Sequence, residues 1–193
     1  MLTPRQIELI EAAIELTSNE GIQALTIRNV SAQVGISEAA VYRHFESKQS
    51  LLKAVLVYLG ELVNPLFDEL ATTEAEPQRA LATFLTRLLR LIEQNNAFTL
   101  TLYAEETFNV EPALKEDLLQ LMSTNLGRLA QFFTQAARCG QCRTDISADQ
   151  LALITFGTIR LSVSTWRLND LTHSLSKEGR NLTKVFETLF ALT

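Results

Sequence analysis

The feature that most constrains this chain is the run TIRNVSAQVGISEAAVYRHFESKQSLL, which occupies residues 26–52. Thr26 is a favourable residue for capping the N-terminus of a helix, and Gly35 suits the tight turn that would end that helix. Ser37 is a second N-cap candidate, and the apolar spacing that follows it predicts another helix over 38–45. The run therefore predicts two short helices that meet at a glycine-containing turn.

Two helices joined by such a turn form a helix-turn-helix, in which the second helix enters the major groove of DNA. The small side chains of Ala39 and Ala40 suit the close approach that this docking requires. Ser47 and Lys48 begin a further helix, whose N-terminal amides and ammonium group are suited to a phosphate. We therefore expect double-stranded DNA as a partner, with a base-reading helix beside a phosphate clamp.

Residues 9–52 resemble the DNA-binding domain of the tetracycline-repressor (TetR) family of transcriptional regulators. The segments LIEAAIELTSNEG, LTIRNVSAQVGIS and VYRHFESKQSLL carry the resemblance, and the spacing of Tyr42, Phe45 and Lys48 is its most specific signature. The resemblance implies two sets of DNA-binding residues. Contacts to phosphates or sugars are implied for Thr26, Arg28, Tyr42, His44 and Lys48, and positions near base edges for Ser37, Glu38, Ala39, Ala40 and Arg43.

Some of these residues also have simpler interpretations. His44 is equally consistent with an ordinary surface side chain, and Glu38 with an acid that favours a helix N-terminus. Val41 and Phe45 are expected to pack in the core of the domain. Tyr42 and Lys48 remain the residues whose DNA contacts the resemblance implies most directly.

The net charge of −5 is unusual for a DNA-binding protein, because affinity for DNA comes mainly from lysine and arginine. The distribution of charge matters more than the total. Residues 26–53 contain four basic and two acidic side chains, whereas residues 4–20 contain four glutamates and one arginine. We therefore predict modest binding that weakens steeply with salt.

The rest of the chain is predicted to be helical, with no strand-like alternation and no internal repeat. Prolines, asparagines and glycines divide it into expected helices over residues 48–70, 77–94, 97–107, 112–138, 148–168 and 177–192. The expected architecture is all-α, with about nine helices in total. A helix-turn-helix domain would occupy residues 1–47, and an effector-binding and dimerisation domain residues 48–193.

The expected helix over 148–168 has only Arg160 and Arg167 as charges beyond its first turn. A helix that is apolar nearly all round must be buried on more than one side, and a partner subunit is the simplest cover. In proteins of the family that the chain resembles, the last two long helices pair with those of a second copy. We therefore predict a homodimer through these helices, which would match a palindromic operator.

The resemblance also implies a small-molecule effector, which we expect to be apolar or amphipathic. The middle helices supply aromatic and polar side chains that could line its pocket. The alternative is that the aromatics are ordinary core residues, which is the more common role of any single one. The candidate ligand-binding residues are Phe67, Phe84, Phe98, Thr101, Leu102, Tyr103, Glu105, Phe108, Phe132 and Phe133.

Cys139 and Cys142 form a CxxC motif, which can hold zinc or take part in redox chemistry. A zinc site needs four ligands, and the chain has only two histidines, His44 and His173, to add to the cysteines. The motif also closes a predicted helix, whereas a redox motif normally opens one after a strand. We therefore favour a structural role and expect no metal and no cofactor; oxidation of the pair that releases DNA is the alternative.

The longest apolar stretch, residues 151–166, is interrupted by Arg160 and several hydroxyls, and the N-terminus lacks a signal-peptide pattern. We expect a cytoplasmic protein without a membrane partner, and nothing in the sequence indicates an enzyme. Our main hypothesis is a dimeric repressor released from its operator by a ligand, with activation left open. The alternative is a DNA-bound scaffold that recruits another protein, because SEAAVYRHFESK also resembles nucleoid-occlusion factors.

Overall fold

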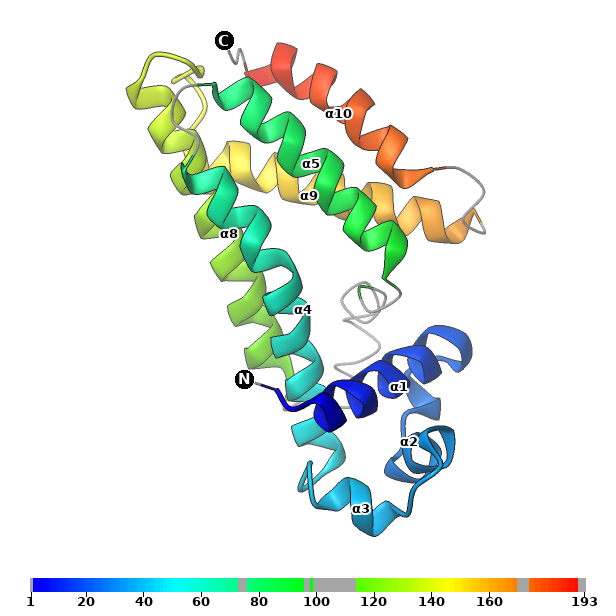
Figure 1. The fold of residues 1–193 in the computed structure, drawn as a ribbon. Coiled ribbons are helices and arrows are strands. Elements are labelled where there is room, and N and C mark those ends of the chain that lie inside the picture. The colour runs from blue at the N-terminus through cyan, green and yellow to red at the C-terminus, as the bar shows by residue number, and fades with distance from the viewer. Residues whose placement is uncertain (1, 73–75, 96–97, 99–113, 170–173, 191–193) are drawn as a thin grey trace. The chain divides into compact units, whose positions relative to one another are not determined.

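The computed structural model describes residues 2–72, 76–95, 98, 114–169 and 174–190. Within these residues the chain forms eight α-helices and one short 3-10 helix, and no strand (Figure 1). The all-α prediction is therefore confirmed. The helix predicted over 97–107 lies outside the described residues. The chain divides into two compact units, one formed by Met1–Leu62 with Asn95–Leu121 and the other by Val63–Gln94 with Met122–Thr193.

The first unit contains the helices of the helix-turn-helix. Helix α1 spans Pro4–Glu20, η1 spans Ile22–Ala24, α2 spans Ile27–Val34 and α3 spans Glu38–Tyr42. A capping box between Thr3 and Gln6 begins α1. Apolar side chains from all three α-helices are buried in one small core, which includes Leu9, Ile10, Ala13, Leu25, Val30 and Val41.

Helix α4, Lys48–Thr72, begins directly after this domain and continues through Pro65. At its start Ser47 and Ser50 exchange hydrogen bonds, because each side-chain oxygen accepts from the other residue's amide at 3.0–3.1 Å. By length and hydropathy alone α4 could cross a membrane, and 44% of its most apolar window is buried inside the structure. A core helix of a water-soluble protein has the same composition, so this is weak evidence for a membrane span.

The second unit is built around α5 (Pro77–Gln94), α9 (Ala148–Leu168) and α10 (Leu175–Phe190). Helix α8 (Lys115–Arg138), like α4, has residues in both units. Figure 1 shows α10 beside α5. Gly179 permits this closeness, because a Cβ there would lie 3.3 Å from the carbonyl oxygen of Leu85. Phe133, Phe186 and Phe190 fill the core with ring centroids about 5 Å apart.

The predicted bounds of α1, α2, α5 and α9 agree with the structure. Helix α4 ends at Thr72 instead of about Leu70, and α8 begins at Lys115, whereas the predicted start at 112 lies outside the described residues. Two further differences have a clear cause in the structure. Helix α3 ends at Tyr42 instead of about Phe45, because the amides of His44 and Phe45 both donate to the carbonyl of Val41 in a closing turn. Helix α10 begins at Leu175, two residues before the predicted start. A carboxylate from another helix, Glu93 of α5, accepts hydrogen bonds from the first amides of α10 and extends it.

Candidate DNA-binding site

The turn between α2 and α3 is held by side chains and a glycine. Thr26 Oγ1 accepts a hydrogen bond from the Asn29 amide at 3.1 Å and so caps α2. Gly35 has a φ of 73°, in the left-handed region where a side chain would be strained. Ser37 Oγ accepts from the Ala40 amide at 3.2 Å and begins α3. These contacts fix the direction in which α3 leaves the turn.

Two buried residues decide which face of α3 is exposed. Val41 is fully buried and Phe45 is 4% exposed, so they anchor the helix and the turn that follows it. Tyr42, by contrast, is a large aromatic residue that is 50% exposed. The other side chains predicted near DNA are also exposed: Ser37, Glu38, Ala39, Arg43 and His44, with Ala40 half-buried. The residues of α3 and of the positions next to it that were predicted to contact DNA are therefore accessible, apart from the half-buried Ala40.

Three of the predicted phosphate contacts lie on or next to α2 and α4. Thr26 and Arg28 are exposed at the start of α2, and Lys48 is half-buried in the first turn of α4. Neither Arg28 nor Arg43 forms an ion pair with any residue that the structure describes. In a chain of net charge −5, two arginines that no described acid engages are available to phosphates.

Two of the glutamates of α1 accept hydrogen bonds from polar side chains within the same unit. Glu15 accepts a hydrogen bond from Gln33 Nε2 at 2.6 Å. Glu11 accepts from the Tyr58 hydroxyl at 3.4 Å, and burial, followed by the charge of Glu11, raises the pKa of Tyr58. Tyr58 therefore stays protonated and keeps donating to this carboxylate at neutral pH.

Residues 9–55, which contain this entire surface from α2 to the start of α4, match the model of the bacterial regulatory proteins of the tetR family. This segment therefore resembles the DNA-binding domain of the TetR family. A TetR-family protein is a DNA-binding regulator and not an enzyme, and the named relatives agree with that class. The DNA-binding role inferred from the residues is therefore confirmed at the level of the family, while the individual contacts stay predictions.

Two curated relatives and one solved structure show what the chain is similar to. The fatty acid metabolism regulator protein of Bacillus subtilis (strain 168) is 21% identical over 175 residues, 89% of this chain and 88% of that protein. The nucleoid occlusion factor SlmA of Aliivibrio fischeri (strain MJ11) is 33% identical over 104 residues, about half of each chain (51% and 53%). The crystal structure of the transcriptional regulator FadR from Bacillus subtilis in complex with stearoyl-CoA has the same fold, with a TM-score of 0.80 at 18% identity over 93% of this chain and 96% of that one.

The aromatic residues predicted to line an effector pocket are buried where the structure describes them. In the second unit Phe67 packs against Phe84 with ring centroids 4.9 Å apart, and Phe132 against Phe133 at 5.2 Å. Phe98 is buried in the first unit. These contacts agree with ordinary core packing. The remaining candidates lie outside the described residues: Thr101, Leu102, Tyr103, Glu105 and Phe108.

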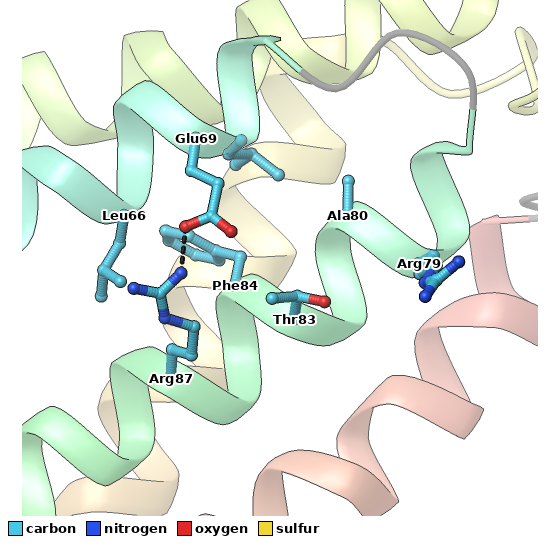
Figure 2. A pocket seen from close by; sticks show the side chains of 8 residues that line it. Leu66, Glu69, Arg79, Ala80, Thr83, Phe84 and Arg87 are labelled. Atoms are coloured by element: carbon cyan, nitrogen blue, oxygen red, sulfur yellow. Dashed lines mark hydrogen bonds and ion pairs between the residues drawn. The ribbon is translucent and has the colours of Figure 1, made fainter.

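A hollow of about 180 Å³ lies between α4 and α5, and Figure 2 draws the side chains that line it. Leu66 and Phe84 lie at its apolar side, and an ion pair between Glu69 and Arg87 spans it. A second hollow, of about 260 Å³, is lined by α4, α5 and α8 and includes Arg128. Both are smaller than the roughly 300–1,000 Å³ typical of a pocket for a drug-sized ligand. Sequence analysis did not identify Arg87 or Arg128, because no local pattern reports an ion pair between distant helices.

The cysteine motif stabilises the end of α10. Cys142 is buried, its Sγ donates to the carbonyl of Phe190 at 3.5 Å, and burial raises the pKa of its thiol. Arg143 donates to the same carbonyl through its amide and to the Leu189 carbonyl through Nη1, at 3.1 and 2.8 Å. Cys139 is exposed. In the part of the chain that the structure describes, no three metal-ligating side chains gather, and these contacts support a structural role for Cys142.

Proposed function

We propose that this protein is a homodimeric transcriptional repressor that binds a palindromic operator through α3 and leaves it when a small molecule binds. The observation that carries the proposal is the exposed face of α3, on which Tyr42 and Arg43 point away from a buried anchor at Val41. Residues 1–47 would bind DNA and residues 48–193 would bind the effector and the second subunit. The protein would act on DNA in the cytoplasm.

Exposed apolar side chains on the last two helices support the homodimer. Leu153 and Leu161 of α9 are 59% and 68% exposed, and Val185 of α10 is 56% exposed. Single apolar residues on a surface are ordinary, but several on adjoining helices are typical of an interaction site. A twofold dimer places two copies of α3 in symmetric positions, and a palindromic operator supplies two equivalent half-sites.

The effector that we propose is an amphipathic molecule of the long-chain acyl thioester class. The support comes from the relatives: one is named a fatty acid metabolism regulator, and a protein of the same fold was crystallised with stearoyl-CoA. Phe67, Phe84, Phe132 and Phe133 remain candidates for its lining. To act as a switch, the ligand must bind the DNA-free conformation more tightly than the DNA-bound one.

The proposal is tested by titrating stearoyl-CoA into a complex of the purified protein with its operator, which is obtained by selecting bound fragments from the source genome. Fluorescence anisotropy of labelled operator should fall at low micromolar stearoyl-CoA, while coenzyme A alone should have no effect. Retention of the complex at saturating stearoyl-CoA would contradict the effector class. A monomeric mass in sedimentation equilibrium would contradict the dimer.

A second candidate is a DNA-bound factor whose larger unit recruits another protein. The observation that favours it is the 33% identity to the nucleoid occlusion factor SlmA over about half of the chain. The distribution of bound genomic fragments separates the two functions. Fragments beside one gene cluster would support the local repressor, and many dispersed sites would support the recruiting factor.

A further inference from the structure

Helix α9 presents an apolar face centred on a glycine. Leu153 and Leu161 are exposed one turn before and one turn after Gly157, and the spacing of four residues places all three on one side of the helix. A hollow of about 480 Å³ extends along this face, which also includes Ile154 and Thr158. The side chains of Leu153 and Leu161 therefore flank a depression at Gly157.

Nothing that the structure describes around Gly157 requires a glycine. The residue is inside a 21-residue helix, where glycine is less stable than alanine. It is not among the glycines with positive φ, and a Cβ built on it has no heavy atom within 4 Å apart from its own helix. A second backbone that approaches α9 at this point would explain the glycine.

One hydroxyl on this face already has a hydrogen-bond partner within its own helix. Thr158 Oγ1 donates a hydrogen bond to the carbonyl of Ile154 at 2.7 Å, so its hydroxyl has a partner without water. Burying a hydroxyl that is already bonded avoids the cost of an unsatisfied donor. The face can therefore be covered by another apolar surface.

We infer that α9 crosses its counterpart in a second copy of this chain at Gly157, with the twofold axis passing beside that residue. In a twofold interface a residue on the axis meets itself, and residues equally far from it on opposite sides meet each other. Leu153 then packs against the partner's Leu161. The inference deepens the proposed homodimer and rests on it.

Charge favours an antiparallel crossing. The first turn of α9 contains Asp149 and its last turn contains Arg167. An antiparallel pair brings these opposite charges, and the opposite ends of the helix dipoles, toward each other, whereas a parallel pair would bring like charges together. The exposed side chains of Leu153, Ile154 and Leu161 beside Gly157 are apolar, as in the core of a homodimer interface, while Thr158 and Glu178 also line the hollow.

The proposed crossing predicts which single cysteine substitutions can form a disulfide between the two subunits. Because an α-helix rises 1.5 Å per residue, Leu153 and Leu161 lie about 6 Å to either side of Gly157. In an antiparallel pair the two copies of Leu153 are then about 12 Å apart along the helices, too far for a disulfide, which requires a Cβ separation of about 3.5–4.5 Å. A cysteine at the crossing point is close to its own copy.

The test introduces Gly157→Cys, Leu153→Cys and Leu161→Cys singly into the full chain with Cys139→Ser, which keeps the buried Cys142. Each purified variant is oxidised with copper phenanthroline, and covalent dimers are quantified on a non-reducing gel. We expect efficient self-cross-linking of Gly157→Cys. Leu153→Cys and Leu161→Cys should cross-link only when the two variants are mixed and allowed to exchange subunits.

Gly127→Cys on α8 is the matched control. Gly127 is also an exposed helical glycine with open space around it, but the residues one turn away, Ser123 and Gln131, are polar and exposed. We expect no cross-linking above that of the Cys139→Ser parent. As a second measurement, Gly157→Leu should raise the dimer dissociation constant at least tenfold in sedimentation equilibrium, and Gly127→Leu should leave it unchanged.

The outcomes separate the crossing from the homodimer. A dimeric mass with no cross-link at Gly157→Cys, or with self-cross-linking of Leu153→Cys, would overturn the antiparallel crossing and leave the homodimer intact. A monomeric mass of the unmodified chain would overturn both. Circular dichroism of each variant checks folding, and the open space at Gly157 gives no reason for the cysteine to disturb it.

Discussion

The guanidinium carbon of Arg128 lies 4.7 Å from the centre of the Phe67 ring. The same guanidinium donates to Asn64 Oδ1 at 2.9 Å and pairs with Asp68. Arg128 is on α8, and the three residues that it contacts are on α4 around Pro65. One side chain therefore joins the second halves of the two helices that have residues in both units of the chain.

Within the first unit the same two helices are joined again. Lys53 Nζ of α4 lies 3.1 Å from Asp117 Oδ2 of α8, as an ion pair without the alignment of a hydrogen bond. Gly60 of α4 also packs near α8, because a Cβ at this position would lie 3.6 Å from Leu121 Cδ1. Each unit thus has its own contacts that hold α4 to α8.

We predict that Arg128→Ala lowers the free energy of unfolding by about 1–2 kcal/mol, from the lost cation–π contact and the lost hydrogen bonds to Asn64. Urea denaturation at pH 7 measures it. Arg87→Ala is the control, because Arg87 and Glu69 are both about half-exposed and such a pair contributes roughly 0–1 kcal/mol. Equal losses in the two variants would show that the stacked geometry of Arg128 adds nothing.

Lys48→Ala and Arg43→Ala should affect DNA binding differently. Removing a phosphate contact at Lys48 should weaken binding to every sequence and reduce the slope of log affinity against log salt by about one. Removing Arg43 near the bases should also relax sequence preference. Anisotropy titrations on the operator and on a scrambled duplex at several salt concentrations measure both. If Arg43→Ala lowered the affinity for the operator and for the scrambled duplex by the same factor, a role of Arg43 in base recognition would be refuted.

Glu93 makes the contact between α5 and α10 dependent on pH. Burial acts to raise the pKa of Glu93, but hydrogen bonds from Ser176, Ser174 and the Leu175 amide together outweigh burial and hold that pKa below its ordinary value. A carboxyl whose pKa is lowered by folding contributes stability above its unfolded pKa and loses it as pH falls through the folded pKa. The contribution is therefore present at pH 7 and disappears in acid.

Glu93→Ala should accordingly lower the unfolding free energy by about 1 kcal/mol at pH 7, the typical worth of a helix cap. The difference from the unmodified chain should shrink as pH is lowered below about 4, near the ordinary pKa of glutamate. Urea denaturation across pH 3–8 provides the comparison. A difference that stays constant over this range would mean that the carboxylate charge is not what stabilises α10.

The start of α10 also shows where prediction from the sequence ended. The bounds of α1, α2, α5 and α9 followed from residues within or next to each helix, such as Ser147 and Gln150, whose predicted capping box is present. The start of α10 depends on Glu93, which is more than 80 residues earlier in the chain. Local patterns contain no information about such a contact, and the same holds for Arg128.

The positions of the residues predicted to bind DNA could be anticipated because they depend on neighbouring residues in the sequence. Caps at Thr26 and Ser37, the turn glycine Gly35 and the buried Val41 lie within a few positions of these residues. An effector pocket has no such local determinant, because its lining comes from several helices. The candidates that the structure describes, such as Phe67 and Phe84, pack against each other.

The two thiols should react at very different rates. Cys139 is exposed, whereas Cys142 is buried and its pKa is raised mainly by that burial, which lowers its thiolate fraction at neutral pH. An aromatic disulfide reagent at pH 7.5 should therefore titrate one thiol quickly, and Cys139→Ser should remove that fast phase. A fast phase that survives in Cys139→Ser would show that Cys142 is accessible.

The alternative role of the cysteine pair, a thiol switch, has a separate test. If peroxide releases the operator from the unmodified chain but not from Cys142→Ser, the thiol switch is favoured over the structural role.

The most direct test of the central claim is the selection of bound fragments from the source genome by the purified protein at near-physiological salt, with Tyr42→Ala as the matched variant. Tyr42 is half-exposed on α3, so its truncation should leave the fold intact, which circular dichroism checks. We predict enrichment of fragments that share a palindromic site, and loss of that enrichment in the variant. Enrichment that is equal in both proteins, or absent in both, would contradict recognition of DNA through α3.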